Sequence, residues 1–573
     1  MTIATPRPWL DSYAEGVPDD IEITDESLLD LIRSSAKEYE QNVALEFFGA
    51  ETTYGELADR IGRAAEGLRK LGVKAGDPVA IILPNCPQAV IAFYAVLRLG
   101  AIAIEHNPLY TPRELRHQFE DHEAKVAIAW DKTVETIQDF PVDVKVAHLV
   151  SVDMTRAMPL HTRAALRLPI RRARESRAAL TTAVRDTVTW EQLISGKRIA
   201  KKHERPTADD IAVIQYTSGT TGAPKGAVLT HRNLVANAAQ ARAWVPDVER
   251  GTSVVYAVLP LFHAYGLTLC LTFAMSMGSR LVLFPRFDPD LVLPVMKRRP
   301  ATFLPAVPPI YERLTLAAKE KKVSLEGIRI SISGAMALSQ KVVKPWEELT
   351  GGYLVEGYGL SECSPVIAAN PVAESRQIGS IGLPLPNTEV RIVDPDDPAS
   401  DRPDGEPGEL LVRGPQVFQG YYRKPEQTAE VFHEDWFRTG DIVTLDGRGF
   451  LRIVDRQKEL IITGGFNVSP TEVEDALRTL PDVADAAVVG QPDERDGEHV
   501  VAVVVPKPGA SPDPDAIRAA MREQLAAYKV PKRVVFRDEL PKSLIGKVLR
   551  KKVRESLGDE SRPGDAASED ADA

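Results

Sequence analysis

The stretch "YTSGTTGAPKGAVLTHRN", residues 216–233, joins two short apolar runs, "IAVIQY" (211–216) and "GAVLTH" (226–231). Short apolar runs bounded by turn residues are typical of buried strands, and "GAVLTH" lacks the pattern of a helix start. The connection between the runs combines glycines, hydroxyl side chains and a single lysine, Lys225. The sequence therefore predicts a strand, a glycine-rich loop and a second strand.

The glycine-rich loop carries the groups that bind phosphate. Backbone N–H groups that glycine leaves accessible, hydroxyl donors and one cation are suited to bind anionic oxygens. A Walker A loop is disfavoured, because that pattern places Gly-Lys-Ser/Thr at its end, whereas Pro224 precedes Lys225 here. An ordinary flexible Gly/Ser/Thr connection is the alternative that the loop alone leaves open. The candidate phosphate-binding residues are Thr217, Ser218, Gly219, Thr220, Thr221, Gly222 and Lys225.

Composition indicates a large globular protein. With 573 residues and 44% hydrophobic content, the chain should divide into at least two domains. The formal net charge of -11 argues against a nucleic-acid partner. Three cysteines without metal-ligand spacing (Cys86, Cys270 and Cys363) give no disulfide framework or zinc site. These features, and an N-terminus without a basic start and apolar core, favour a cytoplasmic protein.

The longest apolar run, "SVVYAVLPLFHAYGLTLCLTFAMSMG" (253–278), is interrupted by Pro260, His263 and Gly266. The remainder, Leu267 to Met277, is too short for a hydrocarbon core of about 30 Å. The run predicts a strand, a polar turn and a buried helix.

Strand-like runs and helical periods alternate over residues 25–455, which predicts a large α/β domain with layered sheets and helices, residues 1–455. From Arg456 a small α+β domain is predicted, residues 456–555. One of its helices should begin with Ser469 as N-cap and Glu472 as capping-box partner. The acidic remainder, 556–573, has no apolar period and is predicted to be disordered.

Residues 155–180, "TRAMPLHTRAALRLPIRRARESRAAL", concentrate arginines in an acidic chain. Leucine, isoleucine and alanine stand between them, so one interpretation is an interfacial element attracted to anionic lipid. A solvated surface loop or short helix is the other.

Several further motifs occur in a fixed order: "PLFHAYG" (260–266), "EGYGLSECSP" (356–365), "GELLVRGPQVFQGYY" (408–422), "WFRTGD" (436–441), "DRQKELIITGGFNVSP" (455–470) and "LPKSLIGKVLRKKVRE" (540–555). Together with the glycine-rich loop they resemble the AMP-forming acyl-CoA synthetase and adenylate-forming superfamily over residues 25–555. "HNPLYTPRELRHQF" (106–119) and "EDWFRTGDIVTLDGRGFLRIVDRQKELI" (434–461) are most similar to bacterial long-chain fatty-acid–CoA ligases.

The resemblance implies a nucleotide site. The glycine-rich loop would hold the β- and γ-phosphates of ATP, and Thr220 with Glu362 would bind Mg²⁺, which requires oxygen ligands. Tyr358 would stack on adenine, and Asp441 and Arg456 would contact the ribose. Ser361 stands where the family has threonine and keeps the hydroxyl. The remaining residues implied in ATP or AMP binding are Gly334, Ala335, Glu356, Gly357, Gly359 and Ile453.

Lys547 resembles the lysine that bridges the substrate carboxylate and the α-phosphate, although Lys542, Lys551 and Lys552 stand nearby. His263 resembles a residue beside the acyl carboxylate, and a satisfied core histidine is the alternative. The resemblance also implies that residues 456–555 move about a hinge at Lys458. This motion would bring the loop with Gly464, Gly465 and Phe466 to coenzyme A. Cys363 is interpreted as a small buried residue.

The implied activity is ATP-dependent conversion of a medium- or long-chain fatty acid to acyl-AMP and then acyl-CoA. Two alternatives within the superfamily are a CoA ligase for another acid, such as an aryl acid, and an enzyme that loads a carrier protein. A non-catalytic acyl-nucleotide-binding protein is disfavoured, because Thr220, Glu362, Asp441, Arg456 and Lys547 are all intact. The expected partners are fatty acid, ATP, CoA and a second copy of the chain in a homodimer, with peripheral membrane contact through 155–180.

Overall fold

The structure, a computed structural model, describes residues 7–217, 224–456, 459–463, 466–493, 497–525, 527–543 and 546–558. The chain divides into two compact units. The large unit comprises Met1–Arg391, Leu411–Thr439 and Asp446–Leu451. The small unit comprises Ile392–Leu410, Gly440–Leu445 and Arg452–Ala573.

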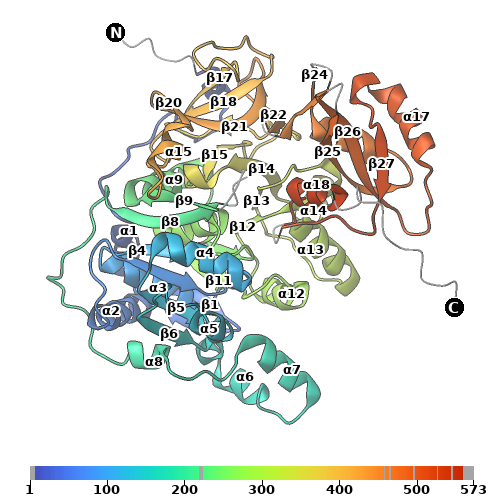
Figure 1. Cartoon of the computed structure of the whole chain (residues 1–573). Coiled ribbons are helices and arrows are strands. Elements are labelled where there is room, and N and C mark those ends of the chain that lie inside the picture. The colour runs from blue at the N-terminus through green and yellow to red at the C-terminus, as the bar shows by residue number, and fades with distance from the viewer. Residues whose placement is uncertain are drawn as a thin grey trace, which may run out of the picture. The chain divides into compact units, whose positions relative to one another are not determined.

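A nine-stranded sheet forms one layer of the large unit (Figure 1), in the order β16-β15-β14-β13-β12-β10-β11-β1-β2. Its central strands are parallel, and β2, β15 and β16 are antiparallel at its edges. The bounds are β1 (Val43–Phe47), β2 (Ala50–Thr53), β10 (Val254–Ala257), β11 (Arg280–Leu283), β12 (Phe303–Ala306), β13 (Ile330–Ser333), β14 (Tyr353–Gly359), β15 (Val366–Ala369) and β16 (Leu383–Pro384).

An eight-stranded sheet forms a second layer, in the order β19-β9-β8-β4-β3-β5-β6-β7. Strands β3, β4, β5, β6, β7 and β8 are parallel to one another, whereas β9 is antiparallel to β8 and to β19. The bounds are β3 (Pro78–Ile82), β4 (Ile102–Glu105), β5 (Val126–Trp130), β6 (His148–Val152), β7 (Val188–Thr189), β8 (Ile211–Thr217), β9 (Lys225–Thr230) and β19 (Gly420–Tyr421). The predicted strands on either side of the glycine-rich loop are therefore confirmed.

Helices pack against both sheets. Every residue of α3 (Pro87–Arg98) is buried, and this helix contacts β3 and β4 of one sheet and β1 of the other. The mixed α/β fold with layered sheets and helices is confirmed. The other helices of the large unit are η1 (Pro8–Ser12), α1 (Leu28–Glu38), α2 (Tyr54–Lys70), α4 (Pro112–His122), α5 (Asp131–Gln138), η2 (Met154–Ala157), α6 (Leu160–Ala165), α7 (Arg171–Leu180), α8 (Trp190–Leu193), α9 (His231–Trp244), α10 (Ala264–Gly266), η3 (Leu267–Thr272), α11 (Phe273–Met277), α12 (Pro289–Arg298), α13 (Pro308–Lys321), α14 (Gln340–Thr350), η4 (Ser361–Cys363) and α15 (Pro425–Ala429).

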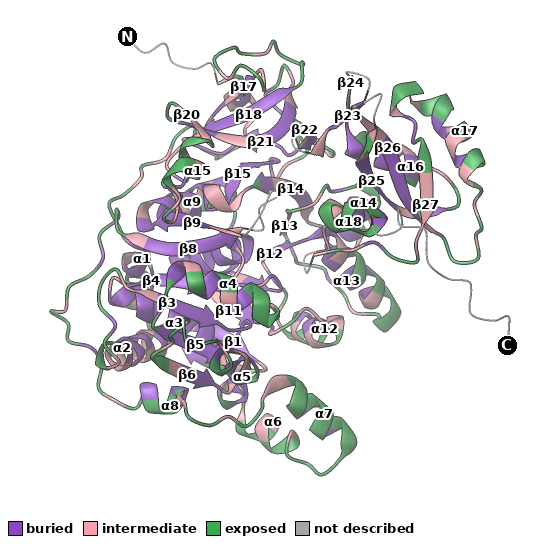
Figure 2. Ribbon diagram, in the orientation of Figure 1, coloured by how far each residue is buried: buried purple, intermediate pink, exposed green. Residues whose placement is uncertain are grey.

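The long apolar run folds as predicted. It forms β10, a turn, and the continuous buried helical segment of α10, η3 and α11, in which η3 has π geometry. Figure 2 shows that the strands of both sheets of the large unit consist mostly of buried residues. Among the residues that the structure describes, no helix is both long and apolar enough to span a membrane.

A five-stranded sheet, ordered β17-β18-β21-β20 with β22 beside β21, contributes residues to both units. Its bounds are β17 (Glu389–Val393), β18 (Gly408–Arg413), β20 (Phe432–His433), β21 (Trp436–Leu445) and β22 (Leu451–Arg456).

The small unit contains the predicted α+β arrangement. A sheet in the order β24-β23-β26-β25, with β27 beside β26, carries helices whose buried residues include Val473 and Met521. The bounds are β23 (Ile461–Thr463), β24 (Phe466–Val468), α16 (Pro470–Arg478), β25 (Val483–Asp493), β26 (Gly497–Pro506), α17 (Pro514–Gln524), η6 (Ala527–Lys529), β27 (Arg533–Phe536) and α18 (Arg550–Gly558).

Two details of the small unit differ from expectation. Ser469 caps α16 by accepting from Glu472 N–H at 3.1 Å, but the Glu472 carboxylate accepts from Lys529 Nζ at 2.7 Å. The predicted capping box is therefore only half formed, because a lysine offers the carboxylate a charged partner. Helix α18 extends to Gly558, so residues 556–558 of the predicted disordered tail are helical, and the rest of that tail lies outside the described residues.

Candidate active site

The glycine-rich loop leaves β8 at Thr217 and returns to β9 at Lys225, and these two residues are partners in the antiparallel ladder. The Thr217 hydroxyl donates to the Lys225 carbonyl at 3.4 Å. A strand follows the loop, whereas a Walker A loop leads into a helix. Five predicted phosphate-binding residues lie outside the described residues: Ser218, Gly219, Thr220, Thr221 and Gly222.

The predicted adenine-binding residues lie at the carboxyl ends of two neighbouring strands of the nine-stranded sheet. Strands β13 and β14 are parallel, and Ser333 is in register with Glu356. The residues that follow β13, Gly334 and Ala335, are therefore beside the carboxyl end of β14, which carries the predicted residues Glu356, Gly357, Tyr358 and Gly359. Ala335 has a positive φ of 65°, a conformation that turns the chain sharply at this end of the strands. The structure thus brings together two segments that are separate in sequence.

Glu356 closes the loop that follows β13. Its Oε2 accepts from Leu338 N–H at 3.0 Å, and burial raises the pKa of this carboxyl to about 8. Gly334 packs against Tyr265, because a Cβ there would lie 3.0 Å from the ring. Tyr265 in turn donates to the carbonyl of Ile332 at 2.7 Å. Packing and hydrogen bonds therefore fix the backbone at the proposed adenine site.

Glu362, the predicted metal ligand, lies in η4 and has a tyrosine partner. Tyr421 O–H donates to Glu362 Oε1 at 2.8 Å. Tyr421 belongs to β19, where it pairs with Ala227 of β9, and the Lys225 ammonium lies 4.9 Å from the centre of its ring. Tyr421 thus links the lysine of the glycine-rich loop with the carboxylate. Sequence analysis missed this residue, although it lies within the quoted motif 408–422, because the contact depends on the pairing of β19 with β9.

His263 is the N-cap residue of α10. Its Nδ1 accepts from Tyr265 N–H at 3.3 Å, and burial lowers the pKa of the imidazole. The ring is therefore neutral and already serves a structural purpose. The core interpretation accounts for this contact with Tyr265, and the role of His263 beside the acyl carboxylate stays a prediction.

In the small unit, Asp441 of β21 is buried and Ile453 of β22 is exposed. Arg456 ends β22, and its side chain is outside the described part of the chain, as is that of Phe466 in β24. Lys458, Gly464 and Gly465 also lie outside the described residues.

Lys547 sits in a tight turn of the small unit. Its N–H donates to Ser543 Oγ at 3.1 Å, and Ser543 N–H donates to the Lys547 carbonyl at 2.7 Å. The neighbouring ammonium of Lys542 is occupied, because it binds Asp485 Oδ2 at 2.7 Å. Lys551 and Lys552 are exposed on α18. The structure therefore assigns Lys542 a local ion pair.

A buried histidine pair, His106 and His122, lies beside Tyr216 of β8, with each ring centre 6.1 Å from the tyrosine ring, and was not anticipated. Ala124 N–H donates to His122 Nδ1 at 3.0 Å, so His122 carries its proton on Nε2. That N–H donates to His106 Nε2 at 3.1 Å, which leaves His106 to donate from Nδ1 to Gln118 Oε1 at 2.5 Å. Burial lowers the pKa of both rings, to about 4 for His106. The chain of bonds requires both imidazoles to be neutral.

Glu105, at the end of β4, is buried, and its Oε2 has no hydrogen-bond partner among the described residues. Burial raises the pKa of this carboxyl from 4.5 to about 8. Because the folded state holds the Glu105 proton more tightly than the unfolded state, this group stabilises the fold fully below pH 4.5. The stabilisation is lost as pH rises through about 8. The loss is about 5 kcal/mol.

We expect Glu105→Gln to make unfolding less sensitive to alkaline pH, because the neutral amide does not have to ionise. At pH 9 the variant should be the more stable protein, and at pH 5 the two should be similar. Urea or thermal unfolding from pH 5 to 9 measures this difference. Glu135→Gln, at an exposed position, is the control and should follow the parent. Parallel pH profiles for Glu105→Gln and the parent would contradict the assignment.

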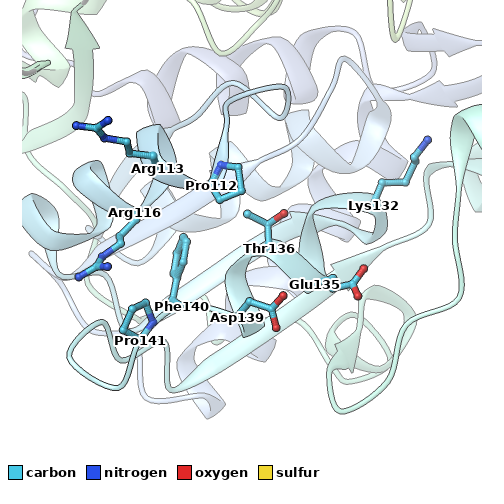
Figure 3. A pocket seen from close by; sticks show the side chains of 9 residues that line it. All are labelled: Pro112, Arg113, Arg116, Lys132, Glu135, Thr136, Asp139, Phe140 and Pro141. Atoms are coloured by element: carbon cyan, nitrogen blue, oxygen red, sulfur yellow. The ribbon is translucent and has the colours of Figure 1, made fainter. Parts of the chain in front are cut away.

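A surface pocket of about 560 Å³ lies between α4 and α5 (Figure 3). Arg116 at its rim binds Glu120 at 2.7 Å and Asp143 at 3.3 Å, so that charge is matched locally. The lining contains none of the predicted site residues: it is Pro112, Arg113, Arg116, Lys132, Glu135, Thr136, Asp139, Phe140 and Pro141.

The fold and these motifs define an AMP-binding enzyme. The AMP-binding enzyme family matches residues 32–422, and the AMP-binding enzyme C-terminal domain matches residues 472–547. The chain therefore belongs to the AMP-binding enzyme family.

Known relatives span nearly the whole chain. A long-chain-fatty-acid–CoA ligase from Bacillus subtilis is 38% identical over 560 residues, which is 96% of this chain and 98% of the relative. A feruloyl-CoA synthase from Amycolatopsis is 34% identical and covers 89% of this chain and 95% of the relative. The crystal structure of ATP-bound MatB from Rhodopseudomonas palustris matches with a TM-score of 0.80 and 31% identity, over 93% of this chain and 100% of that structure.

Proposed function

We propose that the protein is an AMP-forming long-chain fatty-acid–CoA ligase. It would activate a fatty acid with ATP to acyl-AMP, release pyrophosphate, and transfer the acyl group to coenzyme A with release of AMP. The observation that carries this proposal is the 38% identity over 96% of the chain to a long-chain-fatty-acid–CoA ligase.

The first half-reaction brings a carboxylate against the α-phosphate of ATP. Both groups are anions, so the site must offset their repulsion with cations and amide donors directed at the developing charge. We assign the β- and γ-phosphates to the glycine-rich loop, with Lys225 as its cation. Glu362 and Thr220 would hold Mg²⁺, which supplies positive charge to the phosphates when it is bound. The carboxylate of Glu362, oriented by Tyr421, suits a hard cation.

The nucleoside would lie at the carboxyl ends of β13 and β14. Tyr358 would stack on adenine, while Gly334, Ala335 and Glu356 to Gly359 line its pocket. Asp441 and Arg456 would bind the ribose, with Ile453 beside them, and the Ser361 hydroxyl would reach the α-phosphate. Lys547 would bridge the substrate carboxylate and the α-phosphate, and His263 would lie near that carboxylate.

The second half-reaction needs a thiol, which coenzyme A provides. We propose that 1–455 is the AMP-binding and acyl-binding domain and that 456–555 moves about Lys458 after pyrophosphate leaves. Gly464, Gly465 and Phe466 would then approach the pantetheine, since glycine permits close backbone approach. Cys363 is buried, and burial raises the pKa of its thiol, so it is not suited to act as the nucleophile.

A cytoplasmic location, a homodimer and contact with a membrane surface complete the proposal. Light scattering of the purified chain tests the dimer. Membrane contact would suit a substrate that partitions into lipid.

A panel of acids tests the activity. The chain is incubated with ATP, Mg²⁺, CoA and each acid, and thioester is measured. For alkanoates we expect kcat/KM to rise roughly fourfold per added methylene until the acyl site is filled, because each buried methylene contributes about 0.8 kcal/mol. Benzoates and coumarates should be poor substrates.

The similarity to a feruloyl-CoA synthase makes aryl acids the second candidate class. Thioester from coumarates but not from long alkanoates would select it. Acyl-AMP without thioester, unless a carrier protein is added, would select the carrier-loading alternative. Absence of acyl-AMP with every acid, despite ATP binding, would favour a non-catalytic protein.

A further inference from the structure

Residues 155–180 form a helical hairpin on the large unit, between β6 and β7. Helix α6 (Leu160–Ala165) and helix α7 (Arg171–Leu180) are joined by a short turn, and both are largely exposed (Figure 2). We call residues 155–180 the basic hairpin. The sequence left two interpretations, a lipid-attracted element and a solvated surface loop or short helix. Helices here fit both, so the exposure and charge of the side chains must distinguish them.

The exposed face of the basic hairpin is strongly cationic. Five exposed arginines follow α6 in the chain: Arg167, Arg171, Arg172, Arg174 and Arg177. Glu175 is the only acidic residue of the segment, and it pairs with Arg171 at 2.7 Å. Residues three apart on a helix share a face, so Arg171, Arg174 and Arg177 follow one stripe of α7. The charge contrasts with the net -11 of the whole chain.

Apolar side chains accompany the arginines. Leu160 is 78% exposed, Leu168 51% and Ile170 54%. Leu168 and Ile170 lie in the turn that joins α6 to α7. Three of the eight large hydrophobic residues found exposed in the described part of the chain thus fall within eleven consecutive positions, 160–170. A hairpin that met only water would gain nothing from these exposed apolar side chains, whereas a lipid surface would bury them.

The two ends of the basic hairpin are anchored to the body of the large unit. Met158 and Ala173 are buried. Trp130 Nε1 donates to the Leu180 carbonyl at 2.8 Å, and Lys132 Nζ donates to the Ala178 carbonyl at 2.8 Å. The turn between the helices is therefore presented by a preformed support, which reduces the entropy lost when a surface binds.

We propose that the basic hairpin docks on anionic membrane lipid. The arginines contact headgroup phosphates, and Leu168 and Ile170 enter the boundary between headgroups and acyl chains. Charge complementarity and the adjacent exposed apolar residues favour this partner, because interfacial elements combine these two features. The inference rests on the proposed function in one respect: docking would bring the enzyme to the lipid surface into which a long-chain acid partitions.

The test uses the full-length protein and two kinds of vesicle, phosphatidylcholine alone and phosphatidylcholine mixed with phosphatidylserine. The parent should cosediment with the anionic vesicles at least about tenfold more strongly, and salt should weaken this binding. The hairpin variant R167Q/R172Q/R174Q/R177Q should lose about tenfold or more of that affinity. L168S/I170S should weaken binding to the same vesicles while its salt dependence is kept.

A matched control removes the same number of cations elsewhere on the large unit. K319Q/R329Q/K341Q/K344Q changes four exposed residues and should bind anionic vesicles like the parent. Equal binding of the parent to both kinds of vesicle, or equal losses for the hairpin and control variants, would overturn the proposal. Loss of binding to an RNA oligonucleotide by the hairpin variant, with vesicle binding unchanged, would overturn it in favour of a nucleic-acid partner.

Thioester formation from a soluble acid, without vesicles, separates this inference from the proposed function. The hairpin variant should retain that activity within about twofold, since none of its four residues belongs to the proposed site. If the parent forms no thioester yet binds anionic vesicles through the hairpin, the activity fails and the docking surface stands. Unchanged melting temperature confirms that each variant is folded.

Discussion

Replacing Lys547 by alanine should slow acyl-AMP formation by roughly 10²- to 10³-fold while ATP still binds. In the proposed reaction two anions meet, and Lys547 supplies charge that acts mainly as they join. An interaction made in the transition state lowers kcat when it is removed and changes ground-state binding little. Exchange of labelled pyrophosphate into ATP in the presence of fatty acid measures the first half-reaction, and calorimetry measures ATP binding.

Lys542→Ala is the matched control for Lys547→Ala. The two lysines are five positions apart in the same motif, but Lys542 is paired with Asp485 at 2.7 Å. Its removal should affect local stability and leave the exchange rate within a fewfold of the parent. Thioester formation from supplied acyl-AMP should persist in Lys547→Ala, since the proposed role belongs to adenylation alone. An exchange rate equal in both variants would refute the role of Lys547.

Glu362→Gln should reduce adenylation by roughly 10³-fold and raise the Mg²⁺ concentration needed for half-maximal rate. The amide retains the size of the side chain but loses the negative charge that would attract the metal. Tyr421→Phe should have a smaller effect, about tenfold, because the carboxylate remains but loses the hydroxyl that orients it at 2.8 Å. Initial rates across a Mg²⁺ titration measure both changes.

Tyr422→Phe provides the control for Tyr421→Phe, because it removes the neighbouring phenol and leaves the hydrogen bond from Tyr421 to Glu362 in place. It should leave the Mg²⁺ dependence unchanged. A Tyr421→Phe enzyme with a lower rate but an unaltered Mg²⁺ requirement would show that Tyr421 acts on folding or on Lys225, not on the metal ligand. Full activity in Glu362→Gln would remove Glu362 from the metal site.

Much of the local structure could be predicted because it depends on neighbouring residues. The apolar runs 211–216 and 226–231 become β8 and β9. The interrupted run 253–278 becomes a strand, a turn and a buried helical segment, as its proline, histidine and glycine predicted. The N-cap at Ser469 also followed from the residue type. The Glu472 carboxylate was less predictable, because Lys529, which binds it, is 57 positions away in the chain.

The contacts around the proposed site could not be read in the same way. Glu362 meets Tyr421 from 59 positions away, and the ring of Tyr265 in α10 packs against Gly334, which follows β13. The buried pair His106 and His122 looks unremarkable in sequence, since each histidine has ordinary neighbours. Motif order made the family recognisable, but it did not reveal which side chains support the motif residues.

The sequence by itself determined the class of most of the predicted strands and helices, the order of the motifs and the family to which the chain belongs. These depend on periodicity and spacing, which are properties of short segments. The tertiary structure alone decided that Tyr421 joins Lys225 to Glu362, that Lys542 is held by Asp485, and that Leu168 and Ile170 stand exposed among arginines. The physical reason is that strand order and helix packing are set by burial of the whole core, so partners distant in the chain meet only when the sheets have formed.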